Sequence, residues 1–108
     1  MKNNLMIFER KEQAVVSSRV IAERFDKQHQ HVTQAIENLI SENSLVKSMF
    51  IKSYYETERG RAYKEYLMNR DGFSLLVMGF TGKEALEWKL KYIDAFNKME
   101  AFIQERRS

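Results

Sequence analysis

The feature that most constrains the fold is a helical period in residues 32–40, where apolar side chains recur at every third or fourth position. This spacing places them on one face of an amphipathic helix. A shorter helical pattern precedes it at 18–25, with Ser17 or Ser18 as a cap, and only the polar residues 26–28 separate the two patterns. The apolar face comprises Val32, Ala35, Ile36, Leu39 and Ile40. We therefore predict a helix-turn-helix unit over residues 18–42.

Two segments rich in aromatic residues and isoleucine follow this unit, at 49–57 and 62–69. They flank the residues Glu-Arg-Gly-Arg at 58–61, where Gly60 can adopt a positive φ at no steric cost. This pattern predicts a β-hairpin over residues 49–69 with a basic tip. Two shorter strands are expected near the N-terminus, at 5–10 and 12–18, where they would form a first hairpin around Lys11.

Two further helices are predicted after the second hairpin. Asp71 is expected to cap the first, at 72–80, and Thr81 with Glu84 would form a capping box for the second, at 82–106. At 1.5 Å per residue the second helix would be about 37 Å long. The predicted fold is therefore α+β, in the order ββ-αα-ββ-αα with a long C-terminal helix, as one domain over residues 1–108.

A helix-turn-helix followed by a basic hairpin is the element order of a winged helix, in which the second helix enters the major groove of DNA. If helix 28–42 buries its apolar face, the 100° step per residue leaves an amide-rich row on the opposite side. Gln and Asn side chains can pair with adenine, and Lys and Arg can bind phosphates. The predicted DNA-binding residues are Arg19, Lys27, Gln28, Gln30, His31, Gln34, Asn38, Lys52, Arg59, Arg61 and Lys64.

The distribution of charge agrees with this prediction better than the net charge of +3 does. Basic and acidic side chains balance in residues 1–45 and again in 71–108, so the entire excess of positive charge lies in 46–70. A local positive surplus attracts polyanions. Two alternatives remain open: a helix pair with an ordinary solvated outer face, and a structural hairpin whose arginines serve solubility.

The sequence offers little for catalysis or metal binding. It has no cysteine, and its two histidines, His29 and His31, are two positions apart and so about 200° apart around a helix, unlike the i, i+4 histidines of metal sites. His29 is expected to be a partly buried or capping residue. We predict no enzyme activity, cofactor or metal. No apolar stretch approaches the roughly 20 residues of a membrane span, and the N-terminus lacks a secretory signal.

The last helix carries more apolar residues than one buried face needs. One face could pack on the domain and the other on a second copy, which predicts a homodimer. The residues of this dimer or partner surface are Leu86, Leu90, Ile93, Trp88, Tyr92 and Phe96. An alternative function belongs to another class: a protein that binds and inhibits another protein through this helix or the segment 70–85.

The chain resembles the Rha family of phage regulatory proteins. The resemblance is carried by "SSRVIAERFDKQHQHV" (17–32), "GRAYKEYLMNRDGFSLLVMGFTGKEA" (60–85) and "KLKYIDAFNKME" (89–100). It implies a bacteriophage or prophage origin, a location in the cytoplasm of the bacterial host, and DNA binding in gene regulation. It also implies that larger relatives carry a second, C-terminal domain. With a phage origin, the alternative function is that of a small phage protein that binds and inhibits a host protein.

Overall fold

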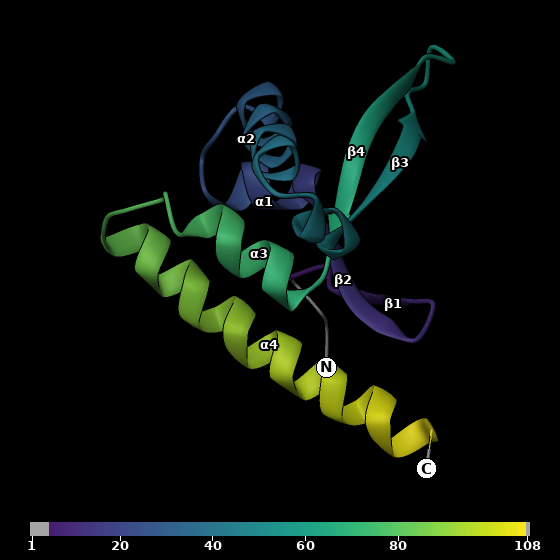
Figure 1. The fold of residues 1–108 in the computed structure, drawn as a ribbon, viewed down its shortest axis with the longest axis vertical. Helices are drawn as coiled ribbons and strands as arrows, with labels where there is room; N and C mark the ends of the chain where they lie inside the picture. The colour runs from purple at the N-terminus through teal and green to yellow at the C-terminus, as the bar shows by residue number, and fades with distance from the viewer. Residues whose placement is uncertain (1–4, 108) are drawn as a thin grey trace.

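The computed structural model describes residues 5–107 and has an α+β fold, in which an antiparallel sheet packs against helices (Figure 1). Its elements follow the predicted order, with one additional 3-10 helix before the third strand. The strands are β1 (Phe8–Arg10), β2 (Gln13–Ser17), β3 (Phe50–Glu56) and β4 (Ala62–Met68); the helices are α1 (Ser18–Arg24), α2 (His29–Glu42), η1 (Ser44–Met49), α3 (Arg70–Val77) and α4 (Lys83–Arg107). The predicted α+β class and the long C-terminal helix are confirmed.

Within the described residues, the strands form a four-stranded antiparallel sheet in the order β1-β2-β4-β3. β3 and β4 pair along their full length, from Phe50 opposite Met68 to Glu56 opposite Ala62. β2 joins β4 only near the base of this hairpin, where Val16 lies opposite Met68. The outer part of the β3–β4 hairpin therefore projects beyond the rest of the sheet, beside α1 and α2 (Figure 1).

A tight turn at the C-terminal end of α1 explains how α2 can follow it so closely. Asp26 has a φ of 55°, a left-handed conformation that Asp tolerates better than most residues. Its N–H donates to the carbonyl of Glu23 (3.3 Å), and the N–H of Lys27 donates to the carbonyl of Ala22 (2.8 Å). These two bonds are those of a Schellman motif, which ends a helix and redirects the chain. At its other end α1 is capped by Ser17, as predicted.

Aromatic side chains form the centre of the core and hold α4 against α3. Phe73, Tyr92 and Phe96 are fully buried, and the ring centroid of Phe73 lies 5.1 Å from that of Tyr92 and 5.6 Å from that of Phe96. Burial of each such side chain stabilises the fold by about 1.5–3 kcal/mol. Near its C-terminus, α4 is tied to β1 by an ion pair between Arg106 and Glu9. α4 lies at the end of the molecule opposite the hairpin tip (Figure 1).

The start of α3 corrects the predicted helix 72–80. The N-cap is Asn69, whose side-chain oxygen accepts a hydrogen bond from the N–H of Gly72 at 2.9 Å. Asp71 lies inside the first turn of the helix, so the prediction that it caps the helix was wrong. The reason is the very short connection: β4 ends at Met68, and only the capping residue separates the strand from α3.

Two other element starts also differ from prediction. α4 begins after Gly82, whose φ is 107° and whose carbonyl accepts a helical hydrogen bond from the N–H of Leu86. Thr81 is therefore one residue too early to serve as the N-cap of the predicted capping box. β1 is shorter than the predicted strand 5–10, because Met6 has a φ of 62° and leaves the extended conformation.

Candidate nucleic-acid interface

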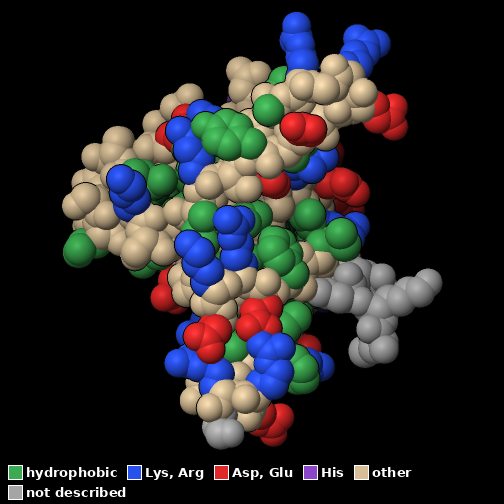
Figure 2. All heavy atoms as spheres, turned by 90° about the vertical axis from the view of Figure 1, so that its right-hand side faces the viewer, with side chains coloured by type: hydrophobic (Ala, Val, Ile, Leu, Met, Phe, Trp, Pro, Cys, Tyr) green, Lys and Arg blue, Asp and Glu red, His purple; other side chains and the backbone are tan. Residues whose placement is uncertain are grey.

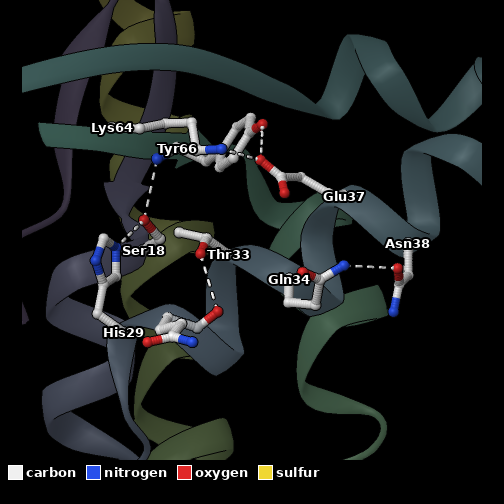
Figure 3. A network of polar contacts seen from close by, with 9 residues as sticks. Ser18, His29, Thr33, Gln34, Glu37, Asn38, Lys64 and Tyr66 are labelled. Carbon is white, nitrogen blue, oxygen red and sulfur yellow. Dashed lines mark hydrogen bonds and ion pairs between the residues drawn. The ribbon is translucent and has the colours of Figure 1, made fainter.

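Ser18 joins α1, α2 and β4 at one buried point. Its side-chain oxygen accepts a hydrogen bond from the N–H of Tyr66 at 3.0 Å and lies 2.8 Å from Nε2 of His29, the first residue of α2 (Figure 3). The Ser18 hydroxyl can accept the bond from Tyr66 and still donate its own hydrogen to a neutral imidazole. The start of α2 is thereby fixed to the hairpin, and His29 is partly buried, as expected.

The surroundings of His29 disfavour its charged form. Burial lowers the pKa of His29, the positive charge of Arg19 lowers it further, and the carboxylate of Glu65 partly opposes both. In its neutral form the ring can accept the Ser18 hydrogen at Nε2, whereas a protonated ring could only donate there. The junction is therefore built around a neutral imidazole.

We expect the stability of the protein to decrease as the pH falls below the ordinary histidine value of about 6.5. Below that pH the unfolded chain binds a proton on His29, whereas the folded chain does not, because its His29 has a lower pKa. The free energy of unfolding therefore decreases as the pH falls from the unfolded pKa toward the folded pKa. His29→Gln should flatten this dependence in melting curves from about pH 8 to about pH 5. His31→Gln, at an exposed position of the same helix, should not. Identical profiles for wild type and His29→Gln would contradict the assignment.

The outer surface of α2 carries a row of polar side chains. Gln34 and Asn38 are exposed one helical turn apart, and Nε2 of Gln34 donates to Oδ1 of Asn38 at 3.1 Å (Figure 3). Each amide retains further donors or acceptors for another partner. The other predicted members of the row are also exposed: Gln28, Gln30 and His31.

Glu37 links α2 to the β3–β4 hairpin. Its carboxylate accepts from the hydroxyl of Tyr66 at 2.9 Å and forms an ion pair with Lys64 (Figure 3). The hydrogen bond from Lys64, followed by that from Tyr66, lowers the pKa of Glu37. Burial, followed by the bond to Glu37, raises the pKa of Tyr66 to about 12. Lys64, a predicted DNA contact, is thus engaged within the protein, and no local pattern signals this because 27 positions separate the two charged residues.

The hairpin ends in a basic turn. Gly60 adopts a φ of 80°, as its place in the turn requires, and the N–H of Thr57 donates to the carbonyl of Arg61 at 2.9 Å. Arg59 and Arg61 are exposed, and neither forms an ion pair within residues 5–107. A shallow hollow at the tip is lined by Thr57, Glu58, Arg59, Arg61 and Tyr63. Figure 2 shows basic side chains projecting at this upper end of the molecule.

Two predicted phosphate contacts lie against aromatic rings. The guanidinium of Arg19 is 3.6 Å from the ring centroid of Tyr55, and the ammonium of Lys27 is 5.1 Å from that of Phe80. Such contacts contribute about 0.5–1 kcal/mol at exposed sites. Both cations belong to exposed residues, so the rings orient them without enclosing them.

Tyrosines on the hairpin were absent from the predicted site. Tyr54 is 62% exposed and Tyr63 is 42% exposed, and the rings of Tyr55 and Tyr63 pair across the strands at 5.8 Å. Lys52, a predicted contact, is exposed on the same side of β3 as Tyr54. Aromatic rings among cations are used by many proteins to contact nucleic acids. The sequence did carry a signal, because aromatic and basic residues interleave along 52–64.

The predicted dimer or partner surface on α4 is partly buried and partly exposed. Tyr92 and Phe96 are fully buried in the core, so the structure removes them from any surface that a partner could reach. Of the predicted surface, Leu86 (56%), Leu90 (60%) and Ile93 (43%) are exposed, and Trp88 is half-buried. The three exposed residues follow the spacing i, i+4, i+7 and form one apolar stripe. A single helix thus has a core face and a separate apolar solvent face.

Within the part of the chain that the structure describes, no three His, Asp or Glu side chains come together in a way that could hold a metal ion. None of the helices in this part is both long and apolar enough to cross a membrane.

The fold and the site define an α+β protein in which a helix pair and a basic hairpin lie side by side, with an amide-rich row on the second helix. The chain belongs to the family of the phage regulatory protein Rha, whose family model matches residues 16–101. The resemblance stated from the sequence motifs is therefore confirmed.

Individual relatives come from bacteria, a prophage and a phage. An uncharacterized protein of Haemophilus influenzae is 34% identical over 88% of this chain and 57% of its own length. The Bacillus subtilis protein named "SPbeta prophage-derived putative antirepressor protein YoqD" is 27% identical over 100% of this chain and 45% of its own. An uncharacterized 22.8 kDa protein of Salmonella phage P22 is 34% identical over 86% of this chain and 48% of its own. The chain thus spans about half the length of these relatives. No solved structure matches it.

Proposed function

We propose that the protein regulates phage genes by binding duplex DNA as a winged helix-turn-helix domain, with α2 as the recognition helix and the β3–β4 hairpin as the wing. The observation that carries this proposal is the bridge from Glu37 to Lys64 and Tyr66, which holds α2 beside the hairpin. Both elements keep their outer side chains open to solvent. Two elements held in this way can engage adjacent parts of one duplex.

In this proposal the amide row of α2 reads base edges. The major groove is about 12 Å wide and admits one α-helix, and Gln or Asn can bond bidentately to adenine. Gln34 and Asn38 hydrogen-bond to each other in the free protein, so both are already aligned along the exposed face. On binding, they exchange this bond for bonds to bases.

Cations around the row hold the sugar-phosphate backbone. Arg19 and Lys27 lie at the first helix and the turn, and Arg59 and Arg61 extend from the wing to phosphate or the minor groove. The regulatory role agrees with the family and with the antirepressor name of the Bacillus relative. The protein acts in the cytoplasm of the bacterial host and needs no cofactor or catalytic group for this function.

The direct test is binding of the purified protein to random and phage-derived duplexes across a salt series. Affinity should fall steeply between about 50 and 200 mM salt, because phosphate contacts release counterions. One phage fragment should bind more tightly than random DNA at every salt concentration. Absence of binding at the lowest salt concentration would refute DNA recognition by this fold.

Gln34→Ala should remove discrimination at one base step while leaving binding to random DNA unchanged. A bidentate amide contact contributes about 1–3 kcal/mol of discrimination against the wrong base. Competition binding with single-base variants of the preferred fragment measures this effect. Gln13→Ala, which removes an exposed amide from the first hairpin, is the matched control and should behave like wild type. An equal decrease in affinity for specific and random DNA would assign Gln34 to backbone contact instead.

A second function, binding and inhibition of a host protein, is favoured by one observation. The apolar stripe of Leu86, Leu90 and Ile93 lies on the solvent side of α4, away from the core residues of the same helix. Exposed contiguous apolar surface is typical of interaction sites. Retention of a host protein by nuclease-treated wild type, and its absence with Leu90→Lys, would support this function.

A further inference from the structure

The outer edge of β3 is a long, unpaired strand edge. β3 is the last strand in the sheet order, and in the described residues no strand lies beyond it. It is seven residues long and forms the outer margin of the hairpin, with α1 and α2 on the far side of β4 (Figure 1). Such an edge presents a row of backbone N–H and C=O groups that can pair with another chain.

The hydrogen-bond pattern of the hairpin identifies which backbone groups face outward. The N–H of Tyr66 points away from β3, because it donates to Ser18. Its cross-strand neighbour Lys52 therefore also points its backbone groups away from β4. The hydrogen bond from the N–H of Thr57 to the carbonyl of Arg61 shows independently that the odd-numbered residue 57 points its backbone groups toward β4. Even-numbered residues of β3 therefore point theirs outward. The outward-facing residues of the outer edge are thus Lys52, Tyr54 and Glu56.

This edge is self-complementary about Tyr54. If a second β3 is placed antiparallel with the two Tyr54 residues opposite each other, each Lys52 lies opposite the other strand's Glu56. All three positions become hydrogen-bonded pairs, and their side chains lie on one face. A lone lysine normally protects a strand edge from pairing with another chain. Here the charge of Lys52 is instead matched by the carboxylate of Glu56 on the second strand.

We propose that two copies of the chain associate by antiparallel pairing of their β3 edges, centred on Tyr54. The sheets join into one continuous sheet across the pair. The hairpin projects from the body of the protein, so the body of the second copy lies toward the tip of the first. A Tyr54 ring that is 62% exposed in the single chain then packs beside its partner's ring.

The test is sedimentation equilibrium over a concentration series without DNA, which keeps it separate from the proposed function. Wild type should self-associate. Lys52→Glu or Glu56→Lys alone places like charges opposite each other twice and should weaken association by roughly tenfold. The double variant Lys52→Glu/Glu56→Lys restores opposite charges and should restore association. A monomeric wild type, or a double variant no better than the single ones, overturns the proposal.

A backbone variant tests the same edge without changing charge. Tyr54→Pro removes one outward N–H, a change that an edge strand tolerates because its ladder to β4 does not use that group. It should be monomeric with the circular dichroism spectrum of wild type. Leu90→Lys, on the exposed stripe of α4, is the control and should associate like wild type. Association that survives Tyr54→Pro and the charge changes but is abolished by Leu90→Lys would place the interface on α4 and overturn the proposal.

Discussion

Gly72→Ala should destabilise the protein by about 2 kcal/mol, although alanine is the better helix former. Gly72 lies in the first turn of α3, where a Cβ would be 2.7 Å from the carbonyl oxygen of Met49 and 3.2 Å from two ring atoms of Phe50. The first distance is far below a van der Waals contact. Relief therefore requires movement of backbone atoms rather than rotation of a side chain.

The obstructing carbonyl is not free to move. The oxygen of Met49 accepts a hydrogen bond from the N–H of Asn69, at the base of the hairpin. Overpacking costs typically 1–3 kcal/mol, and here it exceeds the gain of about 1 kcal/mol from replacing a helical glycine. For a domain of this size the melting temperature should fall by roughly 10 °C.

Gly79→Ala is the matched control for this prediction, because nothing lies within 4 Å of a Cβ at that position. It should leave the melting temperature unchanged or raise it slightly. Thermal denaturation of the three proteins, followed by circular dichroism, measures both effects. If Gly72→Ala has the same melting temperature as Gly79→Ala, the first turn of α3 does not pack against the hairpin base as described.

Gly72 also illustrates what the sequence could and could not predict. The helix pair and both hairpins follow from local periodicity and turn chemistry, which need no tertiary information. The reason for a glycine at position 72 lies instead in its contact with a carbonyl at position 49. The same limit explains the wrong cap: both Asn69 and Asp71 are good capping residues, and the short connection from β4 decides between them.

The candidate site shows a similar division. Exposure of the amide row on α2 follows from the apolar face opposite it, so sequence reasoning placed Gln34 and Asn38 correctly on the surface. The bridge from Glu37 to Lys64 depends on how α2 docks beside the hairpin. From the sequence alone, Lys64 was therefore expected to be a free cation, whereas the structure pairs it with Glu37. Charge counting finds basic segments, but only packing shows which cations are already neutralised.

Arg59→Ala/Arg61→Ala should weaken binding to all duplexes, specific and random alike, by roughly 20-fold near 100 mM salt. Both side chains project from the hairpin tip without an ion pair in residues 5–107, so their removal exposes no buried charge and should not alter folding. The slope of log affinity against log salt should decrease by about 0.9 for each phosphate that the variant no longer binds.

The salt slope distinguishes direct phosphate binding from a general decrease in positive charge. Lys91→Ala/Lys98→Ala removes the same net charge from exposed positions of α4, at the end of the molecule opposite the hairpin tip. Because distant exposed charges are screened, this control should retain the wild-type slope and nearly the wild-type affinity. If the affinity of both double variants falls equally, the net charge of the chain attracts DNA and the hairpin is not a wing. If the slope decreases only in the tip variant, the two arginines lie on the phosphates.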